Sequence, residues 1–227
     1  MAAAPVLGVD ACPGGWVGVC LDGGRAVGRF APTLHGLVGV DGEALSVIAI
    51  DIPIGLPDAG VRQADLLARA ALGPRRSSVF LTPARAAVLA ETYDEANAVN
   101  RRLAGQGVSR QSYGLRTRIL EAEEFVNGWV RPVIEVHPEL SFTMMGGRPV
   151  PASKKTWPGA ERRRELLRQN GIDLCAIGPE VGRAGVDDVL DAAAAAWTAR
   201  RFAAGQAIAR PDEPEAFSDG IAAAIWA

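Results

Sequence analysis

The chain has 227 residues, of which 48% are hydrophobic and 22% are charged, and its formal net charge is −2. These values exclude an intrinsically disordered chain, which needs fewer apolar residues and a larger net charge. No window reaches the roughly 18 to 20 apolar residues of a membrane span, and the first residues lack the basic segment of a secretion signal. Three cysteines without metal-type spacing and two histidines argue against a zinc site and favour a reducing, cytoplasmic setting.

Three short strands are predicted at the start of the chain. They cover residues 6–10, 16–21 and 25–30, and glycine-rich turns separate them. Residues 33–45 are irregular or form a weak helix. Residues 46–52 contain consecutive β-branched side chains and form the clearest buried strand.

The next block has a helical pattern. Apolar residues at helical spacing predict helices over residues 63–72, 84–103 and 111–129. Residues 131–137 return to a strand-like sequence and predict a further strand. Two more helices are predicted over 160–169 and 186–204, whereas 217–227 is ambiguous between strand and helix. The chain is therefore predicted to be one α/β domain, with a helical insertion over about 58–128 after the fourth strand.

Acidic residues lie within or at the ends of the predicted strands. Asp10 ends the first strand, Asp51 lies near the end of the buried strand, and Glu135 lies within the later one. Carboxylates at such places are unfavourable unless they are paired, hydrogen-bonded or bound to a metal. Each of them alone could instead cap a turn or pair with an arginine.

The last predicted helix also begins with acids. Asp188 and Asp191 are three residues apart and Asp187 and Asp191 are four apart, so one helical face presents at least two carboxylates. We interpret Asp187 as a helix-start residue that the helix dipole favours. Together with the strand acids, these are the hard oxygen ligands that Mg²⁺ or Mn²⁺ prefers. Two such ions can activate water and stabilise the leaving oxygen in phosphodiester hydrolysis.

Basic residues are concentrated in two segments. Residues 62–118 carry ten basic side chains against four acidic ones, and residues 148–168 carry seven against two. A metal site beside a rim that binds a polyanion is consistent with this distribution, and so are ordinary solvated surfaces.

Five polar residues in these segments are candidate substrate contacts, with a solvated loop as the alternative for each. They are Arg75, Arg76, Ser78, Lys154 and Lys155. Lysine ammoniums suit phosphate because they are flexible point charges. The run Arg162-Arg163-Arg164, with acids on both sides, predicts a solvated helix face.

Five blocks of the sequence resemble one known family. They are GVDACPGGW at 8–16, IDIPIGL at 50–56, SVFLTPAR at 78–85, EVHPELSF at 135–142 and KKT at 154–156. These blocks, in this order, resemble the domain of unknown function 429 family, a predicted group of RNase H-like nucleases, over about residues 6–204. Residues 188–192 also resemble the closing acidic helix of RuvC-type resolvases.

The resemblance implies an RNase H-like mixed sheet flanked by helices. It implies that a first-strand aspartate, a middle-strand acid and a helix acid converge on metal ions. In this sequence those positions are Asp10, Asp51 or Glu135, and Asp188 or Asp191. The implied function is a nuclease that uses Mg²⁺ or Mn²⁺ in a two-metal mechanism, with DNA or RNA as its partner.

Two other functions are compatible with the same pattern. One is a non-catalytic binding or scaffold protein that keeps the fold. The other is a phosphotransferase of the actin and sugar-kinase type, although the sequence has no Walker A motif. The sequence does not choose between DNA and RNA, nor does it give the oligomeric state.

Overall fold

The computed structural model describes residues 4–227. The chain divides into two compact units. The first unit takes in residues up to Asp51, then Trp129–Ile208 and Trp226–Ala227, and the second takes in Ile52–Gly128 and Ala209–Ile225. The prediction of one domain with an insertion over about 58–128 stays a prediction.

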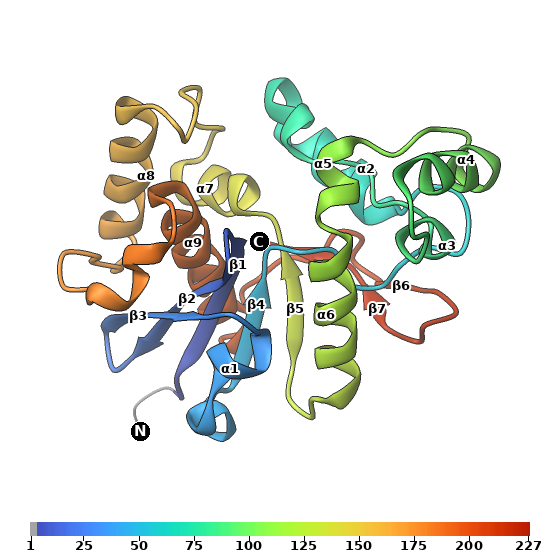
Figure 1. Cartoon of the computed structure of the whole chain (residues 1–227). Helices are drawn as coiled ribbons and strands as arrows, with labels where there is room; N and C mark the ends of the chain where they lie inside the picture. Colours follow the sequence, from blue (N-terminus) through green and yellow to red (C-terminus); the bar gives the residue numbers. More distant parts are fainter. Residues whose placement is uncertain (1–3) are drawn as a thin grey trace. The chain divides into compact units, whose positions relative to one another are not determined.

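The first unit is built on a mixed sheet (Figure 1). Strands β1 and β2 and strands β2 and β3 are antiparallel, whereas β4 runs parallel to β1 and to β5. The order across the sheet is β3-β2-β1-β4-β5-β8. This arrangement confirms the predicted α/β class with a mixed sheet. The strands are β1 (Val6–Cys12), β2 (Gly15–Asp22), β3 (Arg25–Ala31), β4 (Val47–Ile50), β5 (Val133–Val136) and β8 (Ile225–Trp226).

One face of this sheet is covered by the long helix α9 (Val186–Ala203), which packs on β1, β2, β4 and β5. Five consecutive alanines of α9 are completely buried, so the helix backbone comes close to the strands. Gly8 makes that approach possible, because a Cβ there would overlap the backbone of Ala192 and Ala196. Side chains alternate along β1, so Asp10 points to the same face as Gly8.

Helices α7 (Pro138–Gly146) and α8 (Trp157–Gln169) pack against α9 in the same unit. The buried hydroxyls of Ser141 on α7 and Thr198 on α9 form a hydrogen bond of 2.8 Å. Thr156 caps α8 through its hydroxyl. The unit is completed by α1 (Leu34–Val38) and by the 3₁₀ turns η1 (Val40–Ala44) and η3 (Pro179–Arg183).

The second unit is mainly helical. Two segments that were predicted as continuous helices are each divided into two helices. The segment 84–103 forms α3 and α4, because Thr92 caps the start of α4. The segment 111–129 forms α5 and α6, which are separated at Leu115. Across residues 4–227, no helix combines the length and apolarity needed to cross a bilayer. The elements of this unit are α2 (Gln63–Leu72), η2 (Gly73–Ser78), α3 (Arg85–Val88), α4 (Tyr93–Ala104), α5 (Arg110–Gly114), α6 (Arg116–Gly128), β6 (Glu215–Ala216) and β7 (Ala222–Ala223).

Candidate metal centre

Asp10 and Asp51 are placed side by side by the pairing of β1 and β4. Val9 is opposite Ile50 in the parallel register, and the Asp51 N–H donates a hydrogen bond of 2.9 Å to the Val9 carbonyl. Each aspartate therefore follows a paired residue, and both lie on the face of the sheet that α9 covers. The carboxyl ends of adjacent parallel strands thus bring two carboxylates to one point.

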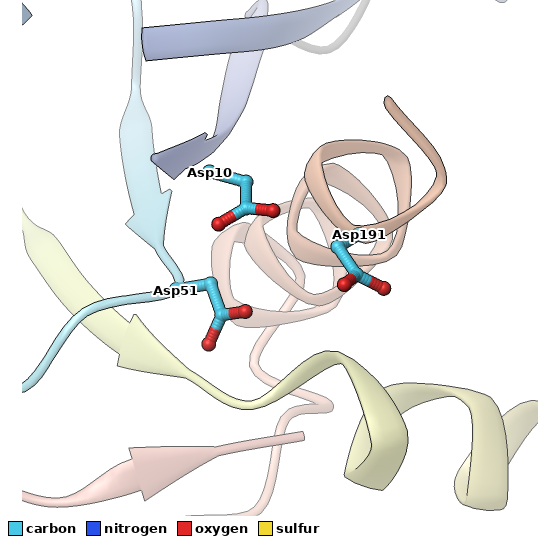
Figure 2. A group of neighbouring side chains, drawn as sticks. All are labelled: Asp10, Asp51 and Asp191. Carbon is cyan, nitrogen blue, oxygen red and sulfur yellow. The ribbon is translucent and has the colours of Figure 1, made fainter. Parts of the chain in front are cut away.

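Asp191 brings the third carboxylate from helix α9. It lies one turn into the helix and is only 2% exposed. One oxygen from each of Asp10, Asp51 and Asp191 lies within 4.8 Å of the others. Figure 2 shows the three side chains as neighbours that come from β1, from the end of β4 and from α9. We call these three residues the acidic triad.

The triad concentrates negative charge where water is scarce. Burial raises the pKa of Asp10 well above its ordinary value, and the neighbouring Asp51 and Asp191 raise it further. Burial also raises the pKa of Asp51 to about 7, although Lys154 opposes this rise. The pKa of Asp191 is likewise raised to about 7, mainly by burial. The three carboxylates therefore need positive charge beside them to be ionised together at neutral pH.

Lys154 supplies part of that positive charge. Its Nζ forms an ion pair with Oδ2 of Asp191. Burial acts to lower the pKa of Lys154, but the carboxylates of Asp191, Asp51 and Asp10 outweigh it and raise the pKa above its ordinary value. Within the described part of the chain, the second oxygen of Asp191, Oδ1, is buried and has no hydrogen-bond partner.

These properties suit a divalent cation. A buried carboxylate oxygen without a hydrogen bond is costly, and a metal ion is one of the few partners that removes the cost. The triad offers only hard oxygen donors, which Mg²⁺, Mn²⁺ and Ca²⁺ accept. Asp10, Asp51 and Asp191 are therefore the residues that could hold a divalent metal, whose identity the donor set alone does not give.

Glu135 and Asp188 lie outside the triad, each for a visible reason. Glu135 is paired with Ile50, so its side chain leaves the sheet on the face opposite to Asp51. Glu135 is nevertheless buried and near enough to raise the pKa of Asp51. Asp188 accepts a hydrogen bond of 3.1 Å from the N–H of Gly185 and so closes the start of α9. Asp187 is also in that first turn.

A second buried pair, which the sequence analysis missed, lies beside this site. The guanidinium of Arg163 on α8 donates a hydrogen bond of 2.6 Å to Glu139 on α7. Arg163 is completely buried, so the interpretation of the arginine run as a solvated face was wrong for this residue. Glu139 lies four residues after Glu135, in the block that resembles the family, and this was the only available signal.

The five predicted substrate contacts fall in both units. Lys154 and Lys155 belong to the first, where Lys155 is exposed. Arg75, Arg76 and Ser78 belong to the second, in η2, where the Ser78 hydroxyl donates a hydrogen bond of 2.9 Å to the Arg75 carbonyl. Their role in binding substrate stays a prediction.

Comparison with known proteins gave a match to a family model. The family model described as Protein of unknown function (DUF429) matches residues 8–216, which include every residue of the acidic triad. No curated protein and no solved structure matched the chain.

Proposed function

This chain belongs to the family described as Protein of unknown function (DUF429), and we propose that it is a nuclease that requires Mg²⁺ or Mn²⁺. The observation that carries this proposal is the acidic triad. Three carboxylates converge from two adjacent strands and one helix, with a buried oxygen of Asp191 that has no hydrogen-bond partner among the described residues.

The fold supports the same proposal. A sheet that begins with three antiparallel strands and continues with parallel strands, with acids on β1, after β4 and on a covering helix, is what an RNase H-like nuclease would require. We therefore take the fold to be RNase H-like. Catalysis would take place at the carboxyl ends of β1 and β4, where the acids meet.

Each residue of the site has a role in this proposal. Asp10 and Asp51, at adjacent strand ends, would hold the metal from the sheet, and Asp191 would hold it from α9. A bound divalent ion would activate a water molecule and stabilise the oxygen that leaves phosphorus. Glu135, on the other face of the sheet, would act only through its charge on Asp51.

Nucleic acid is the proposed substrate class. The segment 148–168, which belongs to the first unit together with the triad, carries seven basic residues against two acidic ones. Lys155 in this segment is exposed and available to a phosphate. Arg75, Arg76 and Ser78 in η2 are proposed as further phosphate contacts. Contacts of this kind make affinity fall steeply as salt rises.

The test is cleavage of a panel of labelled DNA and RNA substrates, single-stranded, duplex, hybrid and branched, with Mg²⁺ or Mn²⁺. Asp10→Asn keeps the shape of the side chain but removes its charge, so we expect cleavage to fall by at least about 100-fold. Asp187→Asn, at the start of α9 and outside the triad, is the matched control and should cleave like the parent chain. Metal binding without cleavage of any substrate would instead favour a binding or scaffold protein, and saturable ATP binding would favour a phosphotransferase.

A further inference from the structure

A lysine ammonium stands at the acidic triad, where the proposed function places metal. Lys154 Nζ pairs with Oδ2 of Asp191 and is also attracted by Asp51 and Asp10. We infer that Lys154 is the second cation of this site, so that the triad holds one divalent ion rather than two. This inference rests on the proposed function, because it assumes that the triad binds metal.

The backbone that carries Lys154 is held in place from both sides. The Thr156 N–H and hydroxyl donate hydrogen bonds of 3.0 and 2.7 Å to the Ser153 carbonyl, which closes a tight turn around the lysine. Gly159 packs against this turn, and a Cβ there would overlap the Ser153 carbonyl. Lys154 therefore starts from a fixed position beside the triad.

Arg163 on α8 also holds the segments on either side of this turn. It donates hydrogen bonds of 3.1 Å to the Ala152 carbonyl and 3.0 Å to the Gly159 carbonyl, and it is itself held by Glu139. Ala152 directly precedes the turn and Gly159 lies in the first turn of α8 after it, so the fully buried arginine ties together the segments on either side of the turn. The backbone that carries the ammonium is thus attached to the folded core of this unit, while the Lys154 side chain is 34% exposed.

The ligand atoms and charges agree with one ion. Asp191 can offer a metal ion only its Oδ1, because its Oδ2 is already paired with Lys154, so Asp191 itself cannot bridge two ions. The three carboxylates of the triad carry three negative charges. One divalent ion and one ammonium balance these charges, so the Lys154 ammonium takes the place of a second metal ion at Oδ2 of Asp191.

The experiment counts bound ions and does not depend on activity. The full chain is freed of metal with a chelator, and Mn²⁺ bound per chain is measured by calorimetric titration and by the electron paramagnetic resonance of free Mn²⁺. We expect one ion in the parent chain and two in Lys154→Ala. Lys154→Gln, which keeps a hydrogen-bond donor but no charge, is a second variant that should also bind two ions. Lys155→Ala is the matched control and should keep one.

The outcomes separate the two proposals. Two ions in the parent chain, or one ion in both Lys154 variants, would overturn the role of Lys154 and leave the metal site intact. No bound ion in the parent chain would overturn the metal site and the role of Lys154 together. Circular dichroism of each variant verifies that the fold is kept, so a change in the ion count can be assigned to the lysine.

Discussion

Gly8 of β1 lies directly against Ala196 of α9, with no room for a side chain between the two backbones. Asp10 follows two residues later on the same face of the strand, and Asp191 is carried by the same helix. The close contact therefore sets the distance between the sheet acids and the helix acid. A metal site that draws ligands from both elements depends on it.

The first prediction is that Gly8→Ala destabilises the chain and weakens metal binding together. The added methyl would overlap the Ala192 carbonyl and the Ala196 backbone, so α9 must move away. Overpacking of a core costs about 1–3 kcal/mol and can cost more against rigid backbone. Urea unfolding measures the stability and Mn²⁺ titration measures the affinity.

The control for Gly8 is Gly24→Ala in the turn between β2 and β3. Gly24 has φ of 85°, so alanine is strained there, yet nothing lies near its Cβ. Because β2 is antiparallel to β1, this turn lies beside the start of β1, at the opposite end of that strand from Asp10. We expect this variant to lose stability without losing affinity for Mn²⁺. A Gly8→Ala chain that binds Mn²⁺ as tightly as the parent would contradict the link between helix packing and the site.

The second prediction concerns the pH dependence of stability without metal. Asp51 and Asp191 have pKa values of about 7 in the folded chain against an ordinary value of 3.8. The folded state therefore keeps protons that the unfolded state loses above about pH 4, so stability falls as the pH rises towards and through 7. Each unit of pKa shift is worth about 1.4 kcal/mol, and each kcal/mol moves Tm by about 2–4 °C at this size.

The measurement is Tm in a chelator between pH 5 and 8.5. Asp51→Asn should flatten the fall, because an amide does not titrate, and it should raise Tm at the upper end of the range. Mn²⁺ should restore Tm most at high pH, where the carboxylates are ionised. A Tm in chelator that rises steadily from pH 5 to 8.5 would show that the triad does not govern stability in this range.

The sequence predicted the strand acids but not their register. Runs of apolar residues that end in an acid predicted Asp10 and Asp51 at strand ends. The structure places Asp51 directly after β4, whereas Asp10 lies within β1, two residues before that strand ends at Cys12. The choice between Asp51 and Glu135 stayed open, because it depends on which face each side chain takes. A shift of one residue in strand pairing reverses the face, and no short-range pattern reports it.

The helix acids show the same limit. Asp188 and Asp191 differ by only about 60° around the helix axis, so sequence spacing cannot say which one faces the sheet. The structure turns Asp191 inward and leaves Asp188 to close the helix start. Arg163 was misread for a related reason: its partner Glu139 is 24 residues away, and a helix pattern does not show contacts with another helix.

The third prediction orders the three acids at the start of α9. Asp191→Asn should abolish Mn²⁺ binding and reduce any cleavage by at least about 100-fold, because it removes a charged ligand. Asp188→Asn should have a small effect, since an amide oxygen can still accept the Gly185 N–H. Asp187→Asn should behave like the parent chain. The readout is Mn²⁺ affinity by calorimetry, and loss of binding in Asp187→Asn alone would refute the assignment.

The last prediction is that Arg163→Met destabilises the chain by about 3–5 kcal/mol at neutral pH. The substitution would leave the Glu139 carboxylate buried without its ion pair to Arg163, and removal of one partner of a buried pair typically costs this much. It would also remove the hydrogen bonds from Arg163 to the Ala152 and Gly159 carbonyls, which lie on either side of the Lys154 turn. The double variant Arg163→Met with Glu139→Gln should recover a large part of the stability, since no lone charge remains.

Urea unfolding of the parent, the single variant and the double variant gives the comparison. Arg164→Met is the matched control: Arg164 is exposed and forms a surface ion pair with Glu161, a kind of contact worth about 0–1 kcal/mol. If Arg163→Met and Arg164→Met cost the same, the buried pair does not stabilise this unit. If the double variant is stable but the Lys154 turn becomes susceptible to proteolysis, the bonds from Arg163 to either side of the turn, rather than its charge, hold Lys154 at the acidic triad.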